Sequence, residues 1–348
     1  MTDILTLTLI IVALALVFDF INGFHDAANA TATIVATRVL PYRYAVVWAA
    51  LFNFLALTVV STGVAATVGK GLMDTQYITS LSIIAGLIAG IGWNLATWYW
   101  GLPASSSHTL LGAYAGAVTG HVLLTTPDAL GEVFIVAGWL KVFAFIVIAP
   151  LVGFVLGYIL RRLLQPLAAR QGSHPARPYK IAQLASSALL SFNHGANDAQ
   201  KTAGILTAAL VAGHFLTVVP GGDFSVPRWV LALSYTTIAL GTAAGGWRVT
   251  RTMGFRLGKL TPVDGVAAET GAALSIGVAT LFALPISTTF ATTGAITGVT
   301  AAQTRDAQSR PTPWPVLRRI GAVWGVTLPL SFVLGASVYA VLSLTGLR

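Results

Sequence analysis

Two polar motifs of similar sequence interrupt long apolar stretches of this chain of 348 residues. Residues 22–30 read Asn-Gly-Phe-His-Asp-Ala-Ala-Asn-Ala, and residues 194–202 read His-Gly-Ala-Asn-Asp-Ala-Gln-Lys-Thr. Aligning Asp26 with Asp198 also aligns a glycine three residues earlier in each motif. A charged side chain at membrane depth is costly and usually faces a partner, a cavity or an ion path. The two motifs are therefore the first candidates for a functional site.

Within each motif the polar residues lie three or four positions apart, the spacing that places side chains on one face of a helix. These residues are Asp19, Asn22, Asp26 and Asn29 in the first stretch, and His194, Asn197, Asp198 and Lys201 in the second. Carboxylate and amide oxygens are ligands for hard cations. Each face could therefore hold a cation, with the alternative that Asp198 and Lys201 only form an internal ion pair and bind nothing.

The composition indicates that a membrane surrounds these motifs. The chain is 55% hydrophobic and only 9% charged, which excludes a soluble protein and is typical of a polytopic membrane protein. The net charge of +9 comes from Lys and Arg in short segments between apolar runs, so the positive-inside rule explains it and no nucleic-acid partner is expected. No cysteine is present, which excludes disulfides and thiolate metal sites. The opening run lacks a basic segment and a cleavage site, so we expect a retained membrane helix.

Apolar runs recur along the chain, and a bilayer crossing needs roughly 20 residues. They lie at 4–37, 44–68, 79–101, 103–120, 133–160, 180–218, 229–247, 265–283, 285–302 and 320–345. The runs 4–37 and 180–218 are too long for one straight crossing, and each carries a motif with a glycine in its middle. We therefore predict a broken helix over 4–37 and another over 180–218, with irregular backbone that lines a cavity.

Two proline-containing breaks separate neighbouring apolar runs without an aqueous loop. At the first break Pro103 precedes Ser105, Ser106, Ser107 and His108, and at the second Pro285 precedes Ser287, Thr288 and Thr289. Proline suits the first turn of a helix, and hydroxyls accept hydrogen bonds from the free N–H groups there. We predict two re-entrant helical hairpins, over 79–120 and 265–302, whose tips lie at membrane depth.

Basic residues determine the expected orientation. The segments 38–43, 161–180, 248–259 and 305–319 carry fifteen Lys or Arg and one acid, which places them in the cytoplasm. The segment 161–180 is then a solvated basic linker between two repeats, 1–160 and 181–348, and both termini lie outside the cytoplasm. The predicted fold is an all-α polytopic membrane protein with two inverted-topology repeats, each with a broken helix and a re-entrant hairpin.

The two motifs and the two hairpin tips, in this order, resemble those of the PiT-type inorganic phosphate transporters, above all the bacterial members. The resemblance rests on residues 23–30, residues 194–201 and the two Pro-x-Ser-Ser/Thr-Ser/Thr tips, and it covers nearly the whole chain. The family pattern Gly-Ala-Asn-Asp-Val-Ala-Asn is changed at His25 and Lys201, and Phe290 stands where the second hairpin often has His. The resemblance implies a secondary active transporter, and no enzyme, that imports inorganic phosphate across the cytoplasmic membrane by cation-coupled symport.

An oxyanion site inside a membrane needs converging hydrogen-bond donors and positive potential. The hairpin tips offer both, because helix N-termini present free N–H groups at the positive end of the helix dipole. The hydroxyls that we predict to bind phosphate are those of Ser105, Ser106, Ser107, Ser287, Thr288 and Thr289. The alternative is that these hydroxyls only cap the two helices.

Carboxylates beside phosphate require a cation. We predict that Asp26 and Asp198 hold a co-transported H⁺, Na⁺ or divalent metal ion such as Mg²⁺, with no fixed metal and no other cofactor. The residues predicted to couple the cation are Asn22, Asp26, Asn29, Asn197, Asp198, Gln200 and Lys201. The Lys201 ammonium would replace one Na⁺, which favours H⁺ or a neutral metal–phosphate pair; the alternative is that Lys201 snorkels to the cytoplasm.

The other ionisable residues of the apolar runs keep two interpretations each. His25, His108 and His194 either relay protons or satisfy helix carbonyls. Asp19 is expected to pair with His25 or Lys201. Glu269 either forms a wall of the site or lies at the membrane interface.

Rival functions are sulfate transport, Na⁺-coupled phosphate symport, an anion channel and an intramembrane hydrolase. The hydrolase is disfavoured because neither Gly-x-Ser-x-Gly nor His-Glu-x-x-His occurs in the chain. An anion channel would not need paired aspartates. The expected partners are inorganic phosphate and the lipid bilayer, and the sequence leaves a homodimer open.

Overall fold

The computed structural model describes residues 4–59, 61–169, 176–216, 225–304 and 314–345. Within these ranges the chain is helical and forms no strand beyond one isolated bridge between Met73 and Phe134, so the all-α prediction is confirmed. The elements are α1 (Ile4–Ala36), α2 (Tyr42–Leu55), η1 (Ala56–Val59), α3 (Gly63–Lys70), η2 (Thr75–Tyr77), α4 (Ser80–Tyr99), α5 (Ser106–Thr125), η3 (Pro127–Glu132), α6 (Val136–Ala169), α7 (Ala176–Ala212), α8 (Arg228–Ala244), α9 (Trp247–Phe255), α10 (Pro262–Leu281), α11 (Thr288–Thr304) and α12 (Trp314–Ser343).

The outer surface of the helices is apolar, as a lipid environment requires. On α6, Leu140, Phe143, Val147 and Leu151 lie three or four residues apart and are 63, 51, 57 and 57% exposed. Five described spans are long and apolar enough to cross a bilayer: Ile4–Ala36, Tyr42–Val59, Ser80–Tyr99, Val136–Ala169 and Trp314–Ser343. The chain is therefore an integral membrane protein.

The predicted breaks in the two motif helices are wrong, because α1 and α7 are each one continuous helix. The motif glycines serve close packing instead of a break. A Cβ on Gly23 would come within 2.2 Å of the Ile238 carbonyl oxygen in α8, and a Cβ on Gly195 within 2.5 Å of the Asn53 carbonyl oxygen in α2. Glycine at these two positions lets neighbouring backbones touch. The predicted end of the second run at 218 falls outside the described residues.

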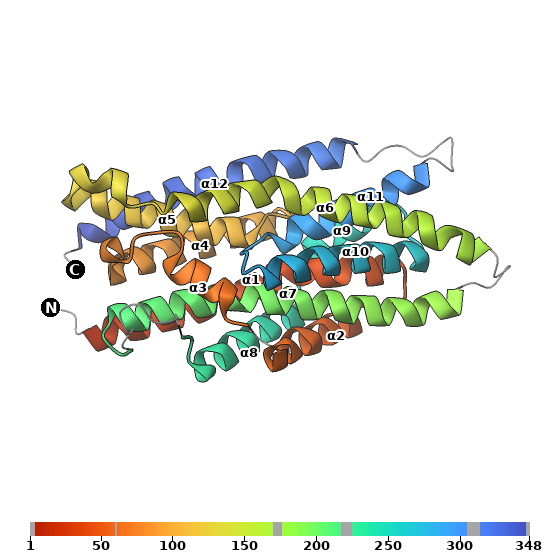
Figure 1. Ribbon diagram of the computed structural model, residues 1–348, viewed down its shortest axis with the longest axis horizontal. Coiled ribbons are helices and arrows are strands. Elements are labelled where there is room, and N and C mark those ends of the chain that lie inside the picture. The colour runs from red at the N-terminus through yellow and green to blue at the C-terminus, as the bar shows by residue number, and fades with distance from the viewer. Residues whose placement is uncertain (1–3, 60, 170–175, 217–224, 305–313, 346–348) are drawn as a thin grey trace.

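Each predicted hairpin corresponds to a pair of packed helices, α4 with α5 and α10 with α11, and their re-entry into the membrane stays a prediction. Each turn contains a residue in the left-handed region, Gly101 with φ 64° and Ala283 with φ 58°, two positions before the proline. In Figure 1 the α4/α5 hairpin extends from the end where both termini lie, and α10/α11 extends from the opposite end. The tips meet inside the molecule, where the Ser107 hydroxyl donates to the Ile286 carbonyl at 3.2 Å.

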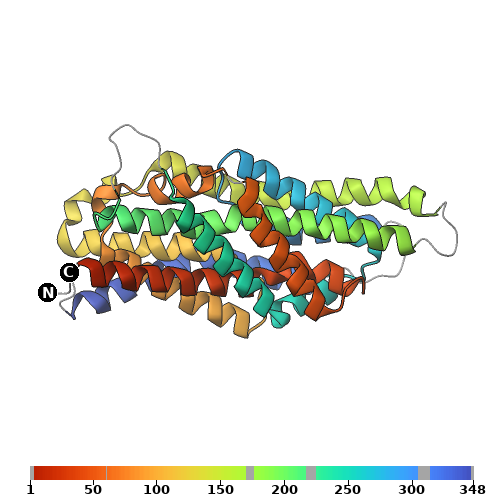
Figure 2. The ribbon, with the colours of Figure 1, turned by 90° about the horizontal axis from the view of Figure 1, so that it is seen from below.

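The two halves of the chain make matching contacts with each other, so that a helix pair in one direction has an equivalent pair in the other. α1 packs on α8 and α7 packs on α2, while α5 packs on α12 and α6 packs on α11. Figure 2 shows α1, α6 and α7 along the long axis, with α2 and α8 inclined to it. This exchange of contacts supports two structural repeats, and their inverted orientation in the membrane stays a prediction.

The segment 161–180 differs from the expected solvated loop. Residues 161–169 continue α6, and residues 176–180 already belong to α7. Arg161 also forms an ion pair with Asp264 at the start of α10. The described part of this linker is therefore helical and partly packed, and only the short stretch between the two helices lies outside the described residues.

Candidate functional site

The first motif aspartate lies against the tip of the first hairpin. Asp26 is only 2% exposed, and its Oδ1 atom accepts a hydrogen bond from the Ser106 hydroxyl at 3.1 Å. The His25 Nδ1 atom lies 2.8 Å from the same oxygen, and the other ring nitrogen is 3.2 Å from the Thr97 hydroxyl of α4. A buried carboxylate is thus held between a hydroxyl on a helix N-terminus and an imidazole.

The second motif aspartate has the matching arrangement at the other tip. Asp198 is fully buried, and its Oδ2 atom accepts from the Thr288 hydroxyl at 3.2 Å and lies 3.3 Å from His194 Nε2. Its Oδ1 atom accepts from the Lys201 ammonium at 2.5 Å. The ion pair of Asp198 with Lys201, which was the alternative to a cation site, is therefore present.

The two motif helices also exchange contacts with the opposite hairpins. The Asn29 amide on α1 donates to the Thr288 and Thr289 hydroxyls at 3.2 and 3.0 Å. At the equivalent position on α7, the Lys201 ammonium donates to Ser107 Oγ at 2.5 Å and to the Ile286 carbonyl at 2.8 Å. Lys201 is 2% exposed, so the alternative that it snorkels to the cytoplasm is wrong.

The six tip hydroxyls divide into two kinds. Ser105 and Ser287 each accept a hydrogen bond at 3.2 Å from the backbone N–H three residues later, so these two hydroxyls cap their helices. The other four, Ser106, Ser107, Thr288 and Thr289, contact motif side chains or the opposite tip. The capping alternative thus describes Ser105 and Ser287, whereas the other four hydroxyls line the region where the two tips meet.

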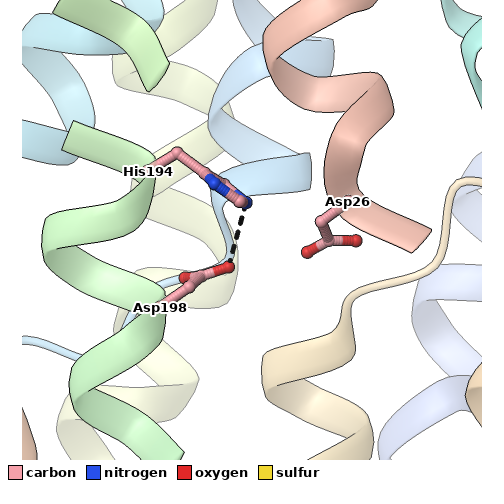
Figure 3. A group of neighbouring side chains, drawn as sticks. All are labelled: Asp26, His194 and Asp198. Carbon is pink, nitrogen blue, oxygen red and sulfur yellow. Dashed lines mark ion pairs between the residues drawn. The ribbon is translucent and has the colours of Figure 1, made fainter. Parts of the chain in front are cut away.

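A cation could be held where the two halves meet. One ligand atom each from Asp26, His194 and Asp198 lies within 4.8 Å of the others, and all three residues are buried (Figure 3). Neighbouring ligands of a six-coordinate Mg²⁺ are roughly 3.0 Å apart, because each lies about 2.1 Å from the ion. These side chains would therefore have to move closer together to coordinate a divalent ion.

Two residues predicted to couple the cation also make structural contacts, and their coupling role stays a prediction. Gln200 accepts from the backbone N–H groups of Val64 and Ala65 at 3.1 and 3.4 Å, so it caps α3. The Asn197 amide donates to Thr280 Oγ1 at 2.9 Å and to the Leu284 carbonyl at 3.0 Å, so it anchors the second tip. Both partners lie far away in sequence, which is why the motif pattern did not reveal them.

The three histidines differ in their surroundings. His25 and His194 contact the motif aspartates, as a proton relay requires. The His108 ring instead packs edge to face on Phe290 at 4.8 Å, and Phe290 stacks on Trp324 at 3.7 Å. These contacts support a packing role for His108.

Asp19 and Glu269 contact groups that the sequence did not indicate. The Asp19 Oδ1 atom accepts from the Thr202 hydroxyl at 2.9 Å, so the expected pairing with His25 or Lys201 is wrong. Glu269 is fully buried, so its side chain faces neither solvent nor lipid. Its carboxylate accepts from Thr33 at 2.6 Å, Gln183 at 2.9 Å and Ser186 at 2.5 Å.

Two supporting residues were missed because each is a single polar side chain in an apolar run. Asn53 on α2 has its Oδ1 atom 3.3 Å from His194 Nδ1 and donates to Thr242 at 2.8 Å. The Thr97 hydroxyl on α4 lies 3.2 Å from His25 Nε2 and so helps to position that ring. A search of the sequence for single polar residues within apolar runs would have found Asn53 and Thr97.

Comparison with known proteins identifies the family and the fold of the chain. The model of the phosphate transporter family matches residues 22–176 and 166–335. A probable low-affinity inorganic phosphate transporter of Rhizobium meliloti is 41% identical over 330 residues, covering 94% of each chain, and one of Bacillus subtilis is 39% identical over 348 residues, covering 99% of each. A solved structure described as the sodium-dependent phosphate transporter has the same fold, with a TM-score of 0.84, 23% identity and coverage of 97% of this chain and 99% of that one. The family consists of transporters, not enzymes, and the chain belongs to this phosphate transporter family.

Proposed function

We propose that the chain imports inorganic phosphate across the cytoplasmic membrane by symport with a cation, and that H⁺ is the favoured cation. Phosphate as the substrate is supported by the printed names of the Rhizobium meliloti and Bacillus subtilis relatives. In this orientation both termini lie outside the cytoplasm, as the distribution of Lys and Arg favours.

One observation carries the proposal: a hydroxyl of each tip already donates to a motif carboxylate, Ser106 to Asp26 and Thr288 to Asp198. These donors stand at helix N-termini, where an oxyanion is favoured. A phosphate that enters between the tips would take over these hydrogen bonds. The carboxylates would then lose their donors and would need a positive charge.

The charges near the site explain why a cation accompanies phosphate. Asp26 and Asp198 carry two negative charges, Lys201 carries one positive charge, and phosphate adds one or two further negative charges. An uncompensated excess of negative charge in a dry site is strongly unfavourable. Protons or a metal ion must therefore enter with phosphate, and this requirement couples the two movements.

Two features favour the proton over Na⁺. Lys201 already supplies a fixed charge at the position equivalent to Asn29, so one cation fewer is required. His25 and His194 contact the two carboxylates and can carry protons. The cluster of Asp26, His194 and Asp198 also suits a divalent ion that enters as a neutral metal–phosphate pair.

The test is uptake of labelled phosphate into proteoliposomes under separately imposed H⁺ and Na⁺ gradients, each with and without Mg²⁺. We expect accumulation against a gradient when H⁺ is the driving ion, with stimulation by Mg²⁺ and little response to Na⁺. Excess unlabelled sulfate should leave uptake unchanged. Equilibration without accumulation would identify a channel, and competition by sulfate would identify a sulfate carrier.

A further inference from the structure

A second carboxylate site lies on α1, two helical turns before Asp26. Asp19 is fully buried, and its Oδ1 atom accepts from Thr202 on α7. Its Oδ2 atom has no hydrogen-bond partner among the described residues, and no described basic side chain forms an ion pair with it. An unpaired buried carboxylate at membrane depth indicates a functional group.

A second buried oxygen on the same helix face shares this lack of a donor. Asn22 is 3% exposed, and its Oδ1 atom has no partner within the part of the chain that the structure describes. Residues three positions apart on a continuous helix are neighbours, so the two side chains lie one beside the other. Both atoms are acceptors, and neither receives a hydrogen from a described residue.

We infer that Asp19 is a proton-binding site, and that its protonated Oδ2 atom donates to the Asn22 carbonyl oxygen. The chemistry is reversible transfer of one proton from a hydronium ion to the carboxylate, which breaks one O–H bond of the hydronium ion, forms one on Oδ2 and releases water. This inference rests on the proposed symport, since the Asp19 proton would be a coupling ion. A proton suits the pair because one new O–H group gives each unpartnered oxygen a hydrogen.

Nearby charges would link this proton to the central site. The titratable groups in electrostatic contact with Asp19 are Asp198 on α7 and Tyr235 on α8, and Lys201 shares α7 with Asp198. A further negative charge in this dry region favours neutral Asp19. Phosphate that arrives beside Asp198 would therefore favour proton uptake at Asp19, and the reverse would hold when phosphate leaves. This reciprocity is the physical basis of coupling.

The experiment compares two modes of transport in proteoliposomes that contain the full chain or Asp19→Asn. Exchange of labelled for unlabelled phosphate involves no net proton movement, whereas accumulation driven by a pH gradient does. We expect the variant to lose at least tenfold in accumulation driven by the pH gradient and to lose much less in exchange. Asp128→Asn, which removes an exposed acid in η3, is the matched control and should behave as the parent.

A second measurement separates a proton site from a structural role. A pH-sensitive dye should record about one fewer proton taken up when inorganic phosphate is added to purified Asp19→Asn than when it is added to the parent. Asp19→Glu should restore accumulation driven by the pH gradient. Equal loss of exchange and accumulation, unchanged accumulation, or a shift in Na⁺ dependence alone would overturn the inference. A parent that exchanges no phosphate would instead refute the proposed function.

Discussion

Lys201 is the fixed positive charge of the central site, and its replacement tests the electrostatic argument directly. The ammonium donates to Asp198 at 2.5 Å, to Ser107 at 2.5 Å and to the Ile286 carbonyl at 2.8 Å. These contacts join α7 to both hairpin tips. Lys201→Asn removes the charge and leaves the buried Asp198 carboxylate with hydrogen bonds alone.

The magnitude follows from the burial of the pair. Removing one partner of a buried ion pair costs about 3–5 kcal/mol, because the other charge stays desolvated and uncompensated. At about 1.4 kcal/mol per factor of ten, this cost lowers the population of the competent site by roughly two to three and a half powers of ten. We expect phosphate uptake by Lys201→Asn to fall to background at neutral pH unless Na⁺ takes the place of the ammonium.

The assay measures initial phosphate uptake by parent and Lys201→Asn over a range of Na⁺ concentrations at constant pH. The parent should respond to pH and little to Na⁺, and the variant should be inactive or require Na⁺. Asp198→Asn combined with Lys201→Asn removes both charges and should recover most of the lost thermal stability without recovering uptake. Strong Na⁺ stimulation of the parent, or an unaltered ion dependence in the single variant, would refute the reasoning.

Three further outcomes are expected. Asp26→Asn and Asp198→Asn should each abolish accumulation in proteoliposomes while the protein still inserts, because each removes a charge that the cation requires; near-normal accumulation by either would contradict this. Ser106→Ala in the first tip and Thr288→Ala in the second should each raise the phosphate KM by roughly 5- to 150-fold, since a lost charge-assisted donor costs about 1–3 kcal/mol. Gly23→Ala should destabilise the detergent-solubilised protein by about 1–3 kcal/mol in thermal unfolding, because its Cβ meets the α8 backbone, whereas Gly92→Ala, with no atom within 4 Å of the added Cβ, should not.

The hairpins could be predicted from sequence because their signals are local. Pro103 and Pro285 end the preceding runs, and the hydroxyls that follow them satisfy the first N–H groups of α5 and α11. Helix capping depends on residues three positions apart, so a short stretch of sequence contains the whole interaction. The pairing of Asp198 with Lys201 was foreseeable for the same reason.

The role of the motif glycines could not be predicted, because their partners are distant in sequence. Gly23 contacts the backbone of Ile238, and Gly195 contacts that of Asn53. A glycine inside an apolar helix is compatible with either a break or a close helix crossing, and only the partner helix distinguishes them. Gln200 illustrates the same limit, since the α3 backbone that it caps lies 136 residues away.

The exchange of contacts between the halves gives the site its asymmetry. Asn29 and Lys201 occupy equivalent places and each holds the hairpin tip of the other half, one through a neutral amide and the other through an ammonium. If both positions were amides, two carboxylates and a phosphate would face each other with only bound cations between them. With one ammonium, one of these charges is compensated permanently, and the remaining charge must be compensated by an ion that can leave. In the proposed symport, the identity of the residue at position 201 would therefore determine how many cations phosphate must bring with it.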